Sequence, residues 1–178
     1  MAVVSLTALV AVLLWGYPAP AVAGPFEDAT AARERGDYAA MLAIIRPLAE
    51  QGDARAENAL GLIYREGVGV PRNGAEAIKW FRRSAEQGFA RGQVNLAGMH
   101  VDGPAASKDY AQALMWLRKA ADQNEASGQH GLGVMYQEGL GVPRDAAEAA
   151  RWYRLAADQG YVDSQHHLGR LYRDGQGV

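Results

Sequence analysis

The sequence predicts an all-α fold in which helix-turn-helix units stack along a line to form an α-solenoid. The first observation is that tryptophan recurs every 36 residues, at Trp80, Trp116 and Trp152. The second is that leucine and glycine keep the same step, at Leu60, Leu96, Leu132 and Leu168 and at Gly67, Gly103, Gly139 and Gly175. Landmarks that share one spacing in a chain of 178 residues indicate an internal repeat.

Three full copies of the repeat cover residues 53–88, 89–124 and 125–160, and a partial copy covers residues 161–178. The third copy contains Leu132-Gly133, Tyr136, the turn Gly139–Val142 and the ending Trp152–Gly160, which reads Trp-Tyr-x-x-Ala-Ala-x-x-Gly. These residues resemble the Sel1-like repeat, a helix-turn-helix unit related to the tetratricopeptide repeat. The resemblance extends over roughly residues 36–178 and implies a right-handed α-solenoid of stacked Sel1-like repeats.

The composition narrows the functional classes. Eighteen basic and 20 acidic residues give a net charge of −2, so bulk charge provides no attraction to nucleic acid or to acidic membranes. A hydrophobic share of 49% with 21% charged residues predicts a folded chain. Because cysteine is absent, disulfides, a thiol nucleophile and a cysteine metal site are excluded, and packing must hold the repeats together.

Residues 1–23 have the pattern of a signal peptide. Residues 2–15 are an uncharged apolar run, shorter than the roughly 20 residues of a transmembrane helix. Ala21-Val22-Ala23 then matches the small-x-small cleavage pattern before Gly24. We therefore expect an exported protein, periplasmic or secreted from a bacterium, with no membrane insertion after cleavage. No Lys or Arg precedes the run, which leaves an uncleaved membrane anchor and a buried helix as alternatives.

Residues 24–52 are expected to form an atypical half-repeat that caps the N-terminal end of the array. Residues 27–35 have the composition of a short polar helix, and residues 38–51 fit the second half of a repeat, with Ile44 at the tryptophan position. Pro47 lies inside this second segment, where the loss of a backbone hydrogen bond predicts a bend. A degenerate first unit suits a cap, because the outer face of a terminal repeat meets water.

Local signals predict the helix ends within the full repeats. Each second helix is expected to begin with a reciprocal capping box, formed by Asn73 and Glu76, Asp109 and Gln112, and Asp145 and Glu148. Left-handed residues are expected to end the first helices at Gly67, Gly139 and Gly175, and the second helices at Gly88, Asn124 and Gly160. These signals place two helices in every copy.

Small and large residues alternate in a way that predicts packing. The first helix should approach its partner closely at Gly61, Ala97, Gly133 and Gly169. The recurring tryptophans should fill the space between neighbouring units. The middle copy differs most, because Gly103–Ala106 replaces the Gly-Val-Gly-Val turn; ordinary drift and a local bend are both open. The last copy stops at Val178, so either the chain is a fragment or an open C-terminal face contacts a partner.

No pattern in the sequence supports catalysis, a cofactor or a metal site. The turns at Gly67–Pro71 and Gly139–Pro143 lack the Gly-Lys-Ser/Thr ending of a phosphate loop. His130 and His166 occupy the same repeat position, but no set of three or four ligands accompanies them. They remain open as a polar recognition ladder or as solvated or packing residues. Serine occurs in neither a Ser-x-x-Lys nor a Gly-x-Ser-x-Gly context.

The remaining candidate site is the concave surface. The resemblance to tetratricopeptide repeats implies that the first helices line this groove, at the positions three residues before the Leu-Gly glycine and one and four residues after it. The predicted groove residues are Asn58, Leu62, Arg65, Val94, Val101, His130, Val134, Gln137, His166, Arg170 and Arg173, with Gly98 at the equivalent position of the second copy. An apolar middle with polar ends suits an extended peptide or a carboxylate-bearing tail.

The sequence therefore predicts an exported, non-catalytic scaffold or adaptor that binds a protein or peptide in this groove. The family resemblance implies adaptor roles in complexes, often at the bacterial envelope. Two alternatives remain: an envelope-associated enzyme or cell-wall-active protein of the β-lactamase-like Sel1 type, and a secreted effector that engages host proteins. The absence of cysteine and of Ser-x-x-Lys argues against the first alternative.

Overall fold

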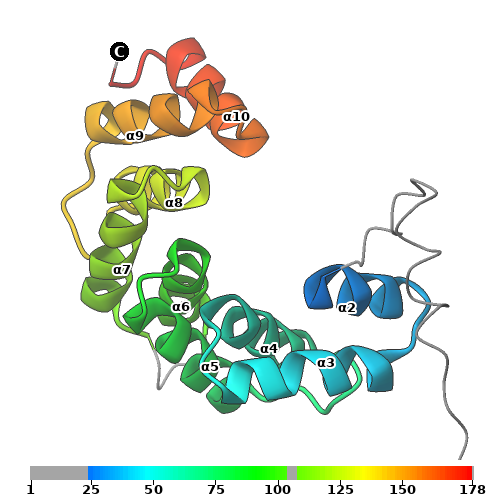
Figure 1. The fold of residues 1–178 in the computed structure, drawn as a ribbon. Coiled ribbons are helices and arrows are strands. Elements are labelled where there is room, and N and C mark those ends of the chain that lie inside the picture. The colour runs from blue at the N-terminus through cyan, green and yellow to red at the C-terminus, as the bar shows by residue number, and fades with distance from the viewer. Residues whose placement is uncertain (1–23, 104–107, 178) are drawn as a thin grey trace, which may run out of the picture.

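The computed structural model describes residues 24–103 and 108–177 of the chain, and these residues form α-helices without a strand (Figure 1). The helices are α2 (Pro25–Glu34), α3 (Tyr38–Glu50), α4 (Ala54–Glu66), α5 (Gly74–Glu86), α6 (Ala90–Asp102), α7 (Tyr110–Asp122), α8 (Ala126–Glu138), α9 (Ala146–Asp158) and α10 (Val162–Arg173). The signal-peptide prediction, residues 1–23, and the altered turn of the middle copy, residues 104–107, lie outside the described residues. Within the described part, no helix is long and apolar enough to span a membrane.

The helices pair and the pairs stack. Within each pair, α2 packs against α3, α4 against α5, α6 against α7 and α8 against α9, and the last helix of each pair contacts the first helix of the next. The first helices also contact each other across repeats, α4 with α6 and α6 with α8. The stack therefore curves into an arc with the first helices on its inner side (Figure 1). The predicted all-α solenoid is confirmed.

The side-chain caps of the second helices are confirmed. Asn73 Oδ1 accepts hydrogen bonds from the backbone N–H groups of Ala75 and Glu76, each at 3.1 Å. Asp109 and Asp145 cap α7 and α9 in the same way, through Oδ1. Each cap satisfies backbone donors that have no partner inside the helix.

The reciprocal half of the predicted capping box is wrong. Instead of bonding to a side chain three residues later, the Asn73 backbone N–H donates to the Tyr64 carbonyl at 2.8 Å. The Asp145 N–H donates to the Tyr136 carbonyl at 2.9 Å, and the Asp109 N–H donates to the equivalent carbonyl of the middle copy. The carbonyl acceptor thus comes from the preceding helix. The Glu76 side chain, three residues after Asn73, instead forms a surface ion pair with Lys79 at 3.5 Å.

The predicted left-handed residues all have positive φ values. Gly67 and Gly139 end α4 and α8 at φ 76° and 72°. Asn124, which replaces glycine after α7, has φ 61° and is the non-glycine residue with positive φ in the described chain. Asparagine tolerates this conformation better than most residues, so the repeat keeps its turn despite the substitution.

Close helix contacts occur where small residues predict them in the full repeats. A Cβ added to Gly61 would lie 2.5 Å from the Phe81 ring, and one added to Gly133 would lie 2.6 Å from the Tyr153 ring. In the middle copy, Ala97 replaces the glycine and is fully buried in the same core cluster as Leu117. Leu117 stands at the position of Phe81 and Tyr153, so the larger Ala97 is accompanied by a smaller side chain on the second helix. Gly169 differs, because nothing lies within 4 Å of its Cβ position.

The tryptophans link neighbouring units, as predicted. Trp80 is 8% exposed and belongs to the core cluster of Met41, Ile45 and Leu60, which lies between α3 and α4. Trp116 packs against two clusters, one built around Phe81 on α5 and one that extends to α8. Since one side chain contacts apolar residues of two units, its burial couples the stability of one repeat to that of the next.

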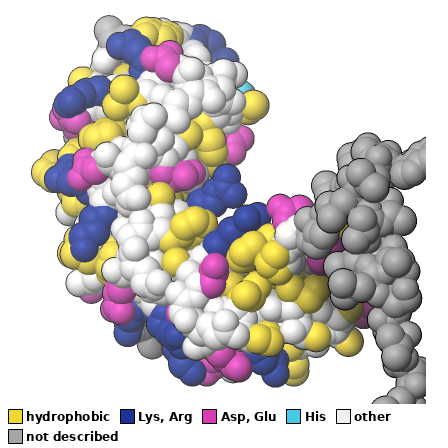
Figure 2. Space-filling view, in the orientation of Figure 1, with side chains coloured by type: hydrophobic (Ala, Val, Ile, Leu, Met, Phe, Trp, Pro, Cys, Tyr) yellow, Lys and Arg dark blue, Asp and Glu magenta, His cyan; other side chains and the backbone are white. Residues whose placement is uncertain are grey.

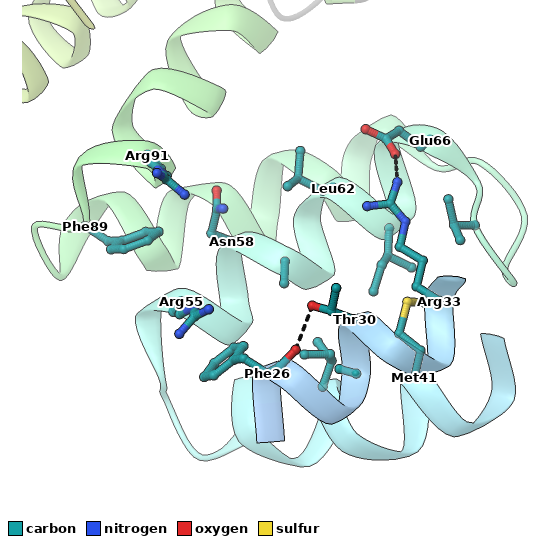
Figure 3. A pocket seen from close by; sticks show the side chains of 15 residues that line it. Phe26, Thr30, Arg33, Met41, Arg55, Asn58, Leu62, Glu66, Phe89 and Arg91 are labelled. Atoms are coloured by element: carbon teal, nitrogen blue, oxygen red, sulfur yellow. Dashed lines mark hydrogen bonds and ion pairs between the residues drawn. The ribbon is translucent and has the colours of Figure 1, made fainter. Parts of the chain in front are cut away.

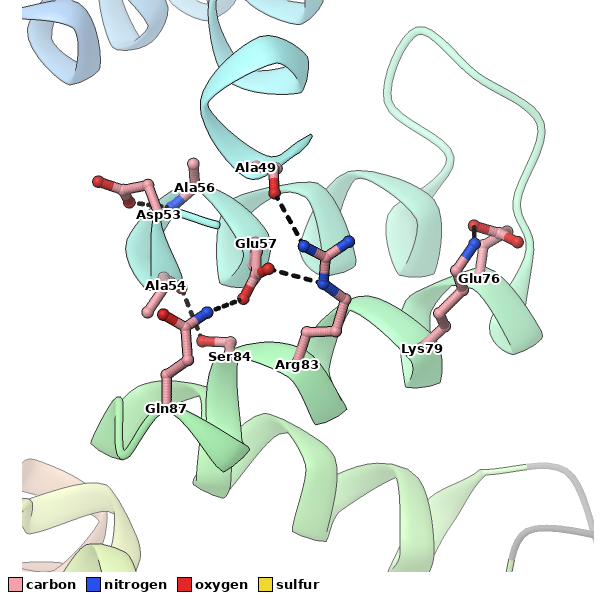
Figure 4. Close-up of polar contacts among 10 residues, drawn as sticks. All are labelled: Ala49, Asp53, Ala54, Ala56, Glu57, Glu76, Lys79, Arg83, Ser84 and Gln87. Atoms are coloured by element: carbon pink, nitrogen blue, oxygen red, sulfur yellow. Dashed lines mark hydrogen bonds and ion pairs between the residues drawn. The ribbon is translucent and has the colours of Figure 1, made fainter. Parts of the chain in front are cut away.

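A polar ladder runs through the repeats in addition to the apolar core. The Gln87 amide donates to the buried carboxylate of Glu57 at 2.6 Å (Figure 4). The same contact recurs one repeat later, where Gln123 donates to Gln93 at 2.9 Å, and two repeats later, where Gln159 donates to Gln129 at 2.8 Å. Each contact joins the first turn of a first helix to the end of the second helix in the same repeat.

Candidate functional site: the concave face

The predicted groove residues lie on the first helices α4, α6, α8 and α10, which form the inner side of the arc. Their exposure differs along the face. Asn58 and Gln137 are buried, each 7% exposed, whereas His166 and Arg173 are exposed. The others are half-buried: Leu62, Arg65, Val94, Val101, His130, Val134 and Arg170. Figure 2 shows Lys and Arg side chains beside hydrophobic ones in the inner bend of the arc.

A pocket of about 220 Å³ occupies the N-terminal part of this face, between α2, α3 and α4 and the start of α6. Its apolar lining comes from Phe26, Ala29, Met41, Ile45, Ala59, Leu62, Ile63, Val68 and Phe89. Two predicted groove residues, Asn58 and Leu62, line it (Figure 3). The pocket is therefore large enough for a single apolar side chain and opens where the groove was expected.

Cationic side chains border the pocket. Arg55 and Arg91 lie with Asn58 at one end, and Arg33 lies at the other end beside Glu66 (Figure 3). The Arg33 guanidinium is 3.6 Å from the Glu66 carboxylate, whereas Arg91 forms no ion pair within the described residues. Arg55 is stacked 4.0 Å above the Phe26 ring and likewise has no carboxylate partner there. Three arginines and one glutamate make the rim positive.

A short hydrogen-bond relay fixes the amide of Asn58. The Arg65 guanidinium donates to Asn95 Oδ1 at 3.2 Å, and Asn95 Nδ2 donates to Asn58 Oδ1 at 2.8 Å. A guanidinium can only donate, so Asn95 must accept with its oxygen and donate with its nitrogen. Because Asn58 Oδ1 accepts from Asn95, the other polar atom of this amide is the donor Nδ2. Asn58 Nδ2 makes no hydrogen bond in the described part of the chain.

A second hollow of about 610 Å³ lies beside the C-terminal ends of α4 and α6. It is lined by Arg65, Arg72, Gly74, Gly98, Met99, Asp102 and Gly103. Arg65 therefore lines the second hollow and also belongs to the relay that fixes Asn58. The second hollow has few apolar side chains, so it offers less to an apolar ligand group than the pocket beside α2.

The C-terminal part of the face contains a cluster of rings. His130 Nδ1 is 2.8 Å from Ser164 Oγ, and the His167 ring is stacked on Tyr153 with centroids 4.9 Å apart. Gln137 Oε1 accepts from the Tyr153 hydroxyl at 3.0 Å and from His167 Nδ1 at 3.2 Å. His167 therefore connects α10 to α8 and α9, and its ring lies 5.5 Å from the His130 ring, measured between centroids.

The environment of this cluster favours neutral imidazoles. Burial lowers the pKa of His130, the neighbouring His167 lowers it further, and Asp163 opposes the shift. Burial likewise lowers the pKa of His167, with Arg170 and His166 acting in the same direction and Asp163 and Glu138 opposing them. Burial raises the pKa of the Tyr153 hydroxyl, so it remains a hydrogen-bond donor at neutral pH.

The cluster has the character of a packing junction. Within the described residues, no group of three or more His, Asp or Glu side chains is arranged to hold a metal ion. The equivalent junction between α4 and α6 contains Asn58, Asn95 and Arg65 in place of His130, His167 and Gln137. The two sets lie two repeats apart in the sequence, and each uses polar side chains to join successive first helices.

Sequence reasoning missed the basic rim of the pocket. Arg55 and Arg91 are 36 residues apart and stand at the same position of successive first helices, so the repeat phase contained the signal. Ser127 and Asp163 follow at the next two positions, which limits the basic character to the N-terminal part. Arg33 and Phe26 could not be found in this way, because α2 precedes the repeats and its packing depends on tertiary contacts.

Comparison with known proteins agrees with this architecture. The Sel1 repeat family matches residues 54–89, 90–125, 126–161 and 162–178. No curated protein matches the chain. Among solved structures, the chain is similar to c5321, described as a protective antigen present in uropathogenic Escherichia coli strains and displaying an SLR fold, with 39% identity and a TM-score of 0.74. It is also similar to a Sel1 repeat protein from Oxalobacter formigenes, with 33% identity and a TM-score of 0.75.

These similarities extend over most of this chain but over less of its relatives. The match to c5321 covers 84% of this chain and 34% of that protein, and the match to the Oxalobacter formigenes protein covers 88% and 62%. Proteins built from such repeats are typically protein-interaction scaffolds. With four matched repeats in a stacked helical array, the chain belongs to the Sel1 repeat family.

Proposed function

We propose that this protein is an exported, non-catalytic scaffold that binds a peptide segment of another protein along its concave face. The observation that carries the proposal is the pocket beside α2, which combines an apolar lining with the buried residue Asn58 and with Arg91, which has no ion-pair partner among the described residues. Such a combination of an apolar cavity with a few convergent polar groups is typical of ligand sites.

The rest of the concave face supports an extended ligand. Beyond the pocket, half-buried Val94 and Val101 on α6 and Val134 on α8 provide apolar surface along the inner side of the arc. A peptide that lies across several first helices would place successive side chains on successive repeats. This arrangement suits a solenoid, because its inner surface is continuous from one unit to the next.

Export is the second part of the proposal. Its support is the apolar run at residues 2–15 followed by Ala21-Val22-Ala23. The absence of cysteine is compatible with either an oxidising or a reducing compartment, so it does not decide the location. Mass spectrometry of the protein from the periplasmic fraction of an expressing bacterium tests this part. A mature N-terminus at Gly24 is expected, and a retained Met1 in a soluble cytoplasmic fraction would contradict it.

A randomised peptide library displayed on phage and selected on the purified full chain tests the binding function. Selected peptides should bind the wild-type protein and should lose binding to the Val134→Glu variant, because a carboxylate would replace apolar surface on the inner side of α8. The exposed outer residue Arg82 provides the control, and Arg82→Gln should bind like wild type. Failure to select any peptide that depends on the concave face would contradict the proposed function.

A further inference from the structure

We infer that the pocket between α2 and α4 selects an acidic side chain that lies next to an apolar side chain in the bound peptide. This inference rests on the proposed peptide-binding function and names the chemistry of one subsite. The pocket presents hydrogen-bond donors and cations around one end of an apolar cavity, and the contacts behind Asn58 explain why its side chain can only donate there.

The first step is the orientation of Asn58. An isolated asparagine offers either a donor or an acceptor to a ligand, depending on how its amide is turned. Here Arg65 fixes Asn95, and Asn95 occupies Asn58 Oδ1 at 2.8 Å. Asn58 is only 7% exposed, and its Nδ2 is the polar atom left for the pocket. Asn58 Nδ2 has no hydrogen-bond partner among the described residues, so it can donate to a ligand acceptor in the pocket.

The second step is charge. Arg55 and Arg91 lie with Asn58 at one end of the pocket, and neither has a carboxylate partner within the described residues (Figure 3). Glu66 is at the opposite end, where it already pairs with Arg33 at 3.6 Å. An anionic acceptor at the Asn58 end would therefore contact donors and cations without facing the glutamate. A carboxylate fits this arrangement, because guanidinium groups bind planar carboxylates with two hydrogen bonds.

The third step is the apolar neighbour. Met41, Ile45, Leu62 and Ile63 line the same cavity, and Met41 lies toward its Arg33 end (Figure 3). A volume of about 220 Å³ accommodates a leucine-sized or phenylalanine-sized group but leaves little room for a folded element. An acidic residue alone would leave this apolar surface exposed to water. Burial of one apolar side chain there is favourable by itself, so both groups are needed for a well-matched ligand.

The fourth step decides between a side-chain carboxylate and a chain-terminal one. The pocket is bordered by α6 through Phe89 and Arg91, and the apolar surface of the concave face continues on α6 and α8. A peptide that extends along this face passes the pocket without ending there. The inference is therefore an internal Asp or Glu beside a large apolar residue.

The test is an NMR titration of the ¹⁵N-labelled full chain with short peptides. The probe peptide contains a Leu-Glu pair flanked by Gly and Ser and is blocked at both ends. Two matched blocked peptides contain Leu-Gln or Ser-Glu in place of this pair, and a third peptide ends in Leu with a free C-terminal carboxylate. At peptide concentrations on the order of 1 mM, the Leu-Glu peptide should shift the Asn58 side-chain amide signal and bind about tenfold more tightly than the Leu-Gln peptide.

Two variants connect the effect to the pocket. Asn58→Asp keeps the acceptor that Asn95 Nδ2 needs but replaces the pocket donor with a carboxylate, and should weaken binding of the Leu-Glu peptide about tenfold. Arg91→Gln removes one exposed cation, with little effect on folding, and should weaken it by a similar factor. Arg82→Gln, with the same charge change on the exposed surface of α5, should leave the affinity unchanged.

The possible results separate this inference from the function on which it rests. Equal binding of the Leu-Glu and Leu-Gln peptides, tighter binding of the terminal-carboxylate peptide, or no binding of the Leu-Glu peptide would each overturn the acidic-apolar specificity. Library peptides that still depend on Val134 while ignoring Asn58→Asp and Arg91→Gln would overturn the subsite and leave the scaffold function standing. Loss of every concave-face peptide would remove both.

Discussion

The carboxylate of Glu57 is fully buried, and its Oε1 lies 2.8 Å from Nε of Arg83 on the neighbouring helix (Figure 4). Equivalent positions in the next repeats contain Gln93 and Gln129, which are buried but uncharged. The first full repeat therefore differs from the others by one buried charge, which is matched by an arginine that also stacks over Trp80 at 4.8 Å and approaches the Ala49 carbonyl.

This pair predicts an asymmetric mutational response. Arg83→Met leaves Glu57 buried without its cation and should lower the free energy of unfolding by about 3 kcal/mol. Glu57→Gln keeps the hydrogen bond from Gln87 and should change stability by less than about 1 kcal/mol. The double variant should recover most of the loss caused by Arg83→Met. Urea denaturation followed by circular dichroism measures all three, and equal losses for both single variants would contradict the charge argument.

Two glycines at the same repeat position predict opposite effects of the same substitution. Gly133→Ala would place a methyl group about 2.6 Å from the Tyr153 ring and should destabilise the fold by about 1–3 kcal/mol. Gly169→Ala meets nothing within 4 Å and should stabilise α10 by about 0.5–1 kcal/mol, because alanine favours helices. Thermal denaturation of both variants distinguishes a steric effect from a general intolerance of alanine at this position, which would lower both melting temperatures.

Trp116 is expected to couple adjacent repeats, because it packs against the apolar clusters on both sides of its own unit. Trp116→Ala should lower the free energy of unfolding by about 3–5 kcal/mol and should broaden the urea transition as the two halves separate. Trp116→Phe keeps most of the apolar contact and should retain a single sharp transition. An unchanged midpoint for Trp116→Ala would show that the ring does not couple the units.

The ring cluster predicts that the docking of α10 weakens in acid. The folded chain holds His130 and His167 below their ordinary pKa of 6.5, so the unfolded chain binds more protons near this pH. The free energy of unfolding should therefore fall as pH decreases through 6.5 toward the lower folded-state pKa values, and should be pH-independent for these groups well above 6.5.

Amide hydrogen exchange of α10 between about pH 7.5 and 5.5, corrected for the intrinsic pH dependence of exchange, measures this effect. The variant His130→Asn with His167→Asn copies the Asn58–Asn95 junction of the earlier repeats and removes both titrating groups. It should show a flatter dependence. The same slope in wild type and variant would assign the acid sensitivity to other groups.

The sequence was sufficient to predict the architecture because its strongest signals are local and periodic. The tryptophan step defines the unit, Asn73 and its equivalents define helix starts, and Asn124 substitutes for glycine at a left-handed turn. The reciprocal capping box failed because a tertiary acceptor, the Tyr64 carbonyl, competes with the side chain of Glu76. Local sequence spacing does not show which acceptor is nearer.

The candidate site was less predictable, because its polar contacts do not follow the repeat. Asn95 joins Arg65 to Asn58, but glycine stands at the equivalent position 131 and histidine at 167. Among the described residues, the Arg65–Asn95–Asn58 relay therefore has no copy in the next repeat, and it cannot be read from a consensus unit. The pocket also needs α2, whose sequence lies before the matched repeats. Its contribution depends on how α2 packs against α4, which the repeat pattern does not encode.

The most direct test of a concave peptide-binding face is amide hydrogen exchange of the full chain with and without a library-selected peptide. The account predicts added protection on the first helices α4, α6 and α8, together with α2, because these form the inner side of the arc. Protection confined to the second helices α5, α7 and α9, or none at peptide saturation, would contradict it.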